Sequence, residues 1–75
     1  MEELKNKGNS EFKQNNLLRA IDYYNEALKF NEKKEILFSN ISTAYLKLEN
    51  YEEALNYAQK AIDLEPNYVK VNIQK

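Results

Sequence analysis

The 75-residue sequence contains no cysteine and no histidine. Without cysteine it has neither a disulfide framework nor a thiolate metal site. Without histidine it lacks the commonest general base and the commonest zinc ligand. Its serines have no base to activate them, and no glycine-rich phosphate loop is present. We therefore expect no catalytic site, no cofactor and no metal.

The sequence also lacks long apolar runs and an excess of positive charge. No stretch approaches the roughly 18 apolar residues that span a bilayer, and the first residues do not have the layout of a signal peptide. The net charge of −1 argues against nucleic-acid binding, which usually needs a basic excess. We expect a soluble protein of the cytoplasm or nucleus, with neither a membrane nor a nucleic acid as partner.

Glycine and proline occur only once each, which suits long helices joined by short turns. Apolar residues make up 43% of the chain, which is ordinary for a globular protein and argues against disorder. A chain of this length forms one domain at most, near the size at which a single core is only just sufficient.

What the sequence does contain is an internal repeat. Ala20, Tyr23 and Ala27 recur 34 residues later as an alanine, a tyrosine and an alanine. The full set of matching pairs also includes Lys13 and Lys47, Asn16 and Asn50, Ile21 and Leu55, Leu28 and Ile62, and Phe30 and Leu64. A period of 34 residues is the spacing of tetratricopeptide helix-turn-helix repeats. The pattern predicts an all-α fold of stacked antiparallel helical hairpins.

Apolar periodicity predicts helices over residues 2–15, 18–31, 35–48 and 51–64, and the start of a fifth from residue 68. The second and fourth helices each have one apolar stripe, formed by Ala20, Ile21, Tyr24, Ala27 and Leu28 and by Ala54, Leu55, Ala58, Ala61 and Ile62. The third has a broader apolar face, formed by Leu37, Ile41, Ala44, Tyr45 and Leu48. We expect the third helix to lie between neighbours, and the first and most polar one to lie at an end.

Small residues and caps support these boundaries. Gly8 lies inside a predicted helix, where glycine costs about 1 kcal/mol relative to alanine, so we expect a second helix to approach its backbone there. Ser42 occupies the equivalent position in the second repeat. Asn50 followed by Glu53 predicts an N-cap with a capping-box partner, and Pro66 predicts the end of the fourth helix.

The repeat divides the chain into residues 1–34, residues 35–68 and the start of a third repeat or capping helix over 69–75. In this last segment Val69 and Ile73 are four residues apart and would cover the fourth helix. We expect the sequence to be part of a longer protein. Its exposed end would then be covered by a further repeat or by self-association.

Along essentially its whole length the chain resembles the tetratricopeptide repeat family. The resemblance rests on small residues and a proline at the positions that the family pattern requires, which are Gly8, Ala20, Ala27, Ala54, Ala61 and Pro66. The first repeat departs from the pattern with Glu32 in place of proline and Glu11 in place of an aromatic residue, although Phe12 is adjacent.

In this family the first helix of each repeat lines a concave groove that holds peptides. The resemblance therefore implies peptide-binding residues on the first, third and fifth helices, with Lys5, Asn9, Phe12, Asn40, Thr43, Leu46, Lys47, Lys70 and Gln74 as candidates. Residues at i, i+4 and i+7 or i+8 share one face of a helix, which groups the candidates on each helix.

Segments 4–9 and 37–40 resemble the carboxylate-clamp repeats of co-chaperones, in which two lysines, two asparagines and an arginine grip a C-terminal aspartate. The resemblance assigns Lys5, Asn9, Asn40 and Lys70 to the clamp, and places Gln74 where the arginine is usual. It implies the acidic Glu-Glu-Val-Asp tails of cytosolic heat-shock proteins 90 or 70 as ligands. Ammonium and amide groups are suitable donors to carboxylates.

Other interpretations stay open at this point. Surface lysines and asparagines are often only solvated, and the groove could hold another kind of peptide. Phe12 and Leu46 could contact a ligand or simply be half-buried packing residues. The main alternative function is a scaffold that assembles a complex through its groove or its stacking ends, without recognising a C-terminal carboxylate.

Overall fold

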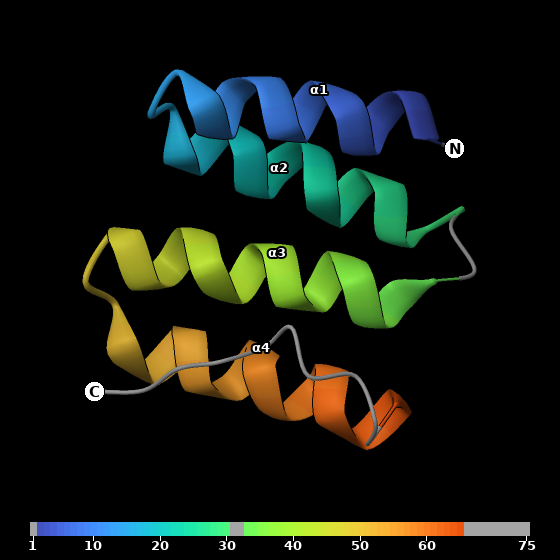
Figure 1. The fold of residues 1–75 in the computed structure, drawn as a ribbon, viewed down its shortest axis with the longest axis vertical. Coiled ribbons are helices and arrows are strands. Elements are labelled where there is room, and N and C mark those ends of the chain that lie inside the picture. Colours follow the sequence, from blue (N-terminus) through green and yellow to red (C-terminus); the bar gives the residue numbers. More distant parts are fainter. Residues whose placement is uncertain (1, 31–32, 66–75) are drawn as a thin grey trace.

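The computed structural model describes residues 2–30 and 33–65 (Figure 1). This part of the chain forms helices and no strand, namely α1 (Glu2–Lys13), α2 (Leu17–Leu28), α3 (Lys34–Lys47) and α4 (Tyr51–Leu64). Each helix packs on the next in an antiparallel stack, α1 on α2, α2 on α3 and α3 on α4. The prediction of an all-α stack of helical hairpins is confirmed. The predicted proline stop and the fifth segment lie outside the described residues.

Two helices end earlier than predicted because the chain turns through a left-handed residue. Asn15 has a φ of 67° and Glu49 a φ of 64°. In each turn the following N–H reaches back to a helix carbonyl, from Asn16 to Glu11 at 2.8 Å and from Asn50 to the Tyr45 carbonyl at 2.9 Å. This is a Schellman ending, which satisfies the last carbonyl groups of the helix. The helices therefore stop at residues 13 and 47 rather than 15 and 48. Helix α2 also ends before the predicted residue 31.

The two left-handed turns lead to a stability prediction. A left-handed conformation costs most L-residues roughly 1–2 kcal/mol, whereas asparagine tolerates it better. We expect Glu49→Asn to raise the free energy of unfolding by about 0.5–1 kcal/mol in urea titrations, because it copies the turn at Asn15. The reciprocal Asn15→Glu should lower it. An unchanged or lower stability for Glu49→Asn would show that this turn is not strained.

The core lies between α2 and α3 and extends to the inner face of α4. Its fully or nearly fully buried side chains are Ala20, Ile21, Tyr24, Ala27, Leu37, Ile41 and Ala44, continued on α4 by Ala54, Ala58 and Ala61. The predicted stripe of α4 is wrong in part, since Leu55 is 56% exposed and Ile62 is 40% exposed. Leu48, predicted on the apolar face of the third helix, is also exposed. Among the described helices α4 packs chiefly on α3, and Leu55 and Ile62 lie outside that contact as exposed side chains.

Small residues lie at contacts between helices, although at Gly8 it is the Tyr24 ring of α2 and not its backbone that fills the space. A Cβ atom added to Gly8 would lie 2.6 Å from Cε1 of Tyr24, so glycine makes room for this ring. At the equivalent position of the second repeat, the Ser42 hydroxyl donates a buried hydrogen bond of 2.7 Å to the Ala54 carbonyl. The predicted N-cap is also present, since the Asn50 side chain accepts from the backbone N–H of Glu53.

Candidate peptide-binding site

A cavity of about 210 Å³ lies between α1 and α3, with α2 at its base. Its lining residues are Asn9 and Phe12 from α1, Tyr24 from α2, and Asn40 and Thr43 from α3. Four of the candidate residues therefore meet in one place, although they come from two helices that are more than twenty residues apart in the sequence. None of the described residues that line this cavity is acidic.

The α1 side of the cavity is held by a hydrogen bond from the core. The buried Tyr24 hydroxyl donates to Oδ1 of Asn9 at 2.5 Å. Burial raises the pKa of Tyr24 to about 12, so its hydroxyl keeps its proton at neutral pH. The Asn9 carbonyl oxygen is therefore occupied from inside the protein, and its amide nitrogen remains as a donor.

Sequence reasoning placed Tyr24 in the core and missed this contact with the site. A signal was present, because a buried tyrosine usually needs a partner for its hydroxyl, whereas phenylalanine would fill the same space without one. The equivalent residue of the second repeat is Ala58, which has no such group.

The α3 side of the cavity is less constrained. The Thr43 hydroxyl donates to the Ser39 carbonyl within its own helix at 3.0 Å. Asn40 is half-buried, and its side chain makes no hydrogen bond to any described residue. Its amide group is therefore available to a ligand, either as a donor or as an acceptor.

Unpaired lysines lie on the two helices that form the cavity. Nζ of Lys47 lies 5.7 Å from the centroid of the Phe12 ring, a cation–π contact that joins α3 to α1. Lys5 is half-buried on α1, one helical turn before Asn9. Among the described residues an ion pair joins Lys29, just after α2, to Glu26, and neither Lys5 nor Lys47 pairs with a described carboxylate.

The remaining candidates are placed differently. Leu46 is half-buried and does not line the cavity. Lys70 and Gln74 lie outside the described residues.

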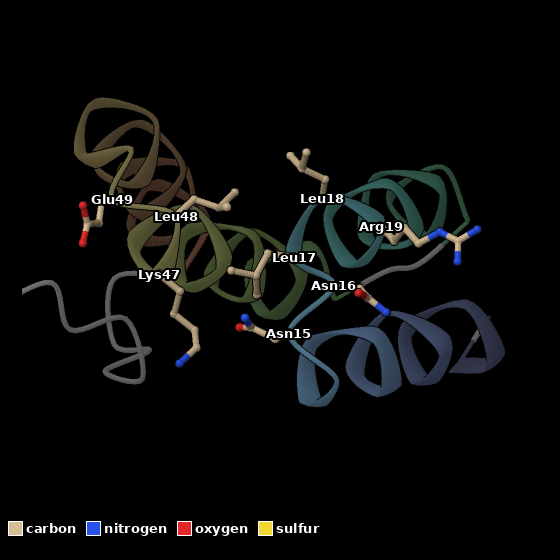
Figure 2. Close-up of a pocket in the computed structure, with 8 residues that line it drawn as sticks. All are labelled: Asn15, Asn16, Leu17, Leu18, Arg19, Lys47, Leu48 and Glu49. Atoms are coloured by element: carbon tan, nitrogen blue, oxygen red, sulfur yellow. The ribbon is translucent and has the colours of Figure 1, made fainter.

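A larger hollow of about 540 Å³ lies at the edge of the stack where α1 turns into α2 and α3 ends (Figure 2). Its lining includes Lys47, Arg19, Glu49 and the exposed Leu18. Figure 2 shows that the charged ends of Lys47, Arg19 and Glu49 point in different directions. Because no set of polar groups converges there, we assign the candidate site to the smaller cavity.

The described part of the chain offers neither a group of metal ligands nor a helix able to span a membrane. In that part no three histidine, cysteine, aspartate or glutamate side chains are grouped so that they could hold a metal ion. None of its helices has the length and apolar character needed to cross a membrane.

Comparison with known sequences identifies the family. Two models described as tetratricopeptide repeat match residues 6–34 and 36–68, which together take in most of the chain. The chain belongs to the tetratricopeptide repeat family.

Individual relatives match nearly the whole chain but are much longer. The heat shock protein sti1 homolog of Schizosaccharomyces pombe is 41% identical over 69 residues, which is 92% of this chain and 12% of that protein. The same identity and coverage of this chain hold for the Hsp70-Hsp90 organizing protein of Triticum aestivum, again over 12% of its length. Serine/threonine-protein phosphatase 5 of Homo sapiens is also 41% identical, over 92% of this chain and 14% of its own length. The chain thus spans only a small part of each of these proteins.

Proposed function

We propose that this chain is a peptide-binding module of a co-chaperone. Its ligand is the acidic C-terminal tail, of the Glu-Glu-Val-Asp type, of heat-shock protein 90 or 70. The observation that carries the proposal is the convergence of Asn9 and Asn40 on one cavity that has no acidic side chain among its described lining residues. The two helices that bear these asparagines also carry Lys5 and Lys47, which form no ion pair with a described residue. We expect such a module in the cytoplasm, where these chaperones are found.

The chemistry of the tail fits the groups around the cavity. A terminal carboxylate and an aspartate side chain offer only acceptors, whereas the Asn9 amide nitrogen and the Lys5 ammonium group are donors. Hydrogen bonds between ionised partners are about twice as strong as neutral ones. Phe12 and Thr43 line the same cavity, and the Phe12 ring would give the valine of such a tail an apolar surface.

The proposal extends to two residues of the clamp pattern outside the described ranges. Lys70 would supply a second ammonium group to the terminal carboxylate. Gln74 would take the place of an arginine, and a neutral amide provides neither the charge nor the bidentate fork of a guanidinium group.

The relatives support a co-chaperone rather than an enzyme. Two of them carry names that refer to heat-shock proteins, one as an organizing protein for Hsp70 and Hsp90. The third is named as a phosphatase, but the match covers 14% of it, and this chain has neither histidine nor cysteine for catalysis. We therefore propose no enzymatic activity for this chain.

Removing one lysine tests the proposal. Charge-assisted hydrogen bonds contribute about 1.5–3 kcal/mol each, so we expect Lys5→Ala to weaken binding of an acidic C-terminal peptide roughly ten- to a hundredfold. Isothermal titration calorimetry gives the dissociation constants. Lys29→Ala is the matched control, because it removes the same charge from an exposed position just after α2, where the ion pair with Glu26 contributes little. Equal affinities for wild type and Lys5→Ala would contradict the proposal.

A scaffold function is the second candidate, and one observation favours it. Tyr51, Leu55 and Ile62 are exposed apolar residues that share one face of α4. A stack that binds its partners through these exposed side chains would not distinguish peptides by their C-terminal group. If no acidic C-terminal peptide binds while the helical fold is intact, the scaffold interpretation is favoured.

A further inference from the structure

The side-chain amide of Asn9 is held in one orientation by the hydroxyl of Tyr24, a residue that is itself closely packed. Its Oδ1 atom accepts from the Tyr24 hydroxyl at 2.5 Å. The oxygen and nitrogen of an amide lie on opposite sides of its carbon, so this contact turns the Nδ2 atom away from Tyr24. Because the Tyr24 phenol keeps its proton, it is the donor of this hydrogen bond and Oδ1 of Asn9 is the acceptor.

The Tyr24 ring has little freedom to release this contact. The side chain is 2% exposed. Its ring occupies the space that a side chain at position 8 would fill, since a Cβ on Gly8 would lie 2.6 Å from the ring. Close packing of this kind holds a buried ring in one rotamer.

The second repeat does not contain this arrangement. The residues 34 positions after Asn9 and Tyr24 are Thr43 and Ala58. Thr43 donates within its own helix, and alanine has no hydroxyl. Asn40, the other asparagine of the cavity, makes no side-chain hydrogen bond to any described residue, so its amide can rotate to suit a donor or an acceptor.

We propose that Tyr24 is a positioning residue for ligand selection, which holds the Asn9 amide so that its nitrogen faces the groove and donates there to an anionic or carbonyl oxygen. This inference rests on the proposed function. Its consequence is that the two asparagines differ in role. Asn9 selects a carboxylate over a group that donates hydrogen bonds, whereas Asn40 binds either kind.

The test is Tyr24→Phe, which keeps the ring over Gly8 and removes only the hydroxyl. We expect it to weaken binding of the acidic peptide with a free C-terminus about two- to tenfold, the usual effect of one lost hydrogen bond. Binding of the same peptide with an amidated C-terminus should be unchanged or slightly stronger, because a released Asn9 can turn its oxygen toward the amide. The dissociation constant of the amidated peptide divided by that of the free peptide should therefore be smaller for Tyr24→Phe than for the wild type. A purely structural defect would weaken binding of both peptides by the same factor.

Tyr45→Phe is the matched control. Tyr45 stacks on Tyr57 with ring centroids 5.7 Å apart, and its hydroxyl makes no hydrogen bond to any described residue. We expect this variant to keep the wild-type ratio. If the wild type discriminates between the peptides and Tyr24→Phe discriminates equally well, the inference is wrong and the proposed function stands. If the wild type itself does not discriminate, the proposed function fails.

A measurement on the unmodified protein covers the case in which Tyr24→Phe does not fold. In nuclear Overhauser spectra the Asn9 side-chain amide protons should show contacts across the groove to Asn40 or Thr43. Strong contacts to the ring protons of Tyr24 would mean that the nitrogen faces the tyrosine, which would overturn the inference.

Discussion

Ala27→Leu is expected to destabilise the fold by about 1–3 kcal/mol, a large share of the stability of a chain this short. Ala27 is completely buried in the cluster formed by Tyr24, Leu37 and Ile41. A leucine there needs space for three further carbon atoms in a closely packed core, so the helices must move apart or side chains must leave their preferred rotamers. For a domain of this size each kcal/mol lowers the melting temperature by about 4–8 °C. Circular dichroism at 222 nm during heating measures the shift.

Asn25→Leu provides the control for this prediction. It introduces the same side chain into the same helix at an exposed position. We expect its melting temperature to stay near that of the wild type, because a substitution in water creates no overlap. If Ala27→Leu melted at the wild-type temperature, the close approach of the helices at Ala27 would not be a determinant of the fold.

The recurrence of small residues made the fold predictable from the sequence. Ala20, Ala27, Ala54 and Ala61 are all completely buried, and the glycine inside α1 lies against an aromatic ring as its position suggested. Helix ends were less predictable, because two of them depend on left-handed turns at residues that are not glycine. Periodicity also could not tell which apolar residues of α4 would be covered, since this depends on what packs beside the helix and not on the helix itself.

The candidate site was predictable as a set of helix faces but not as a set of contacts. Spacings of three residues already placed Asn9 with Phe12 on one face of α1, and Asn40 with Thr43 on one face of α3. Their meeting around one cavity depends on the packing of α1 and α3 against α2. The bond from Tyr24 to Asn9 joins two helices, so no spacing rule within a single helix would reveal it.

Replacing the free C-terminus of the peptide by an amide should have the largest effect on binding. The change removes one negative charge and turns an acceptor into a donor, so it affects every group that holds the terminal carboxylate. We expect the dissociation constant to rise roughly a hundredfold, the equivalent of about 3 kcal/mol. High salt should weaken binding of the free peptide more than binding of the amidated one, because exposed charges attract each other less at high ionic strength.

The most direct measurement is isothermal titration calorimetry of the wild-type chain with a pair of acidic peptides ending in Glu-Glu-Val-Asp, one free and one amidated. We expect the free peptide to bind tightly enough to be measured, and the amidated peptide to bind about a hundredfold more weakly in the same buffer. Equal dissociation constants for the two peptides would contradict recognition of a C-terminal carboxylate by this groove.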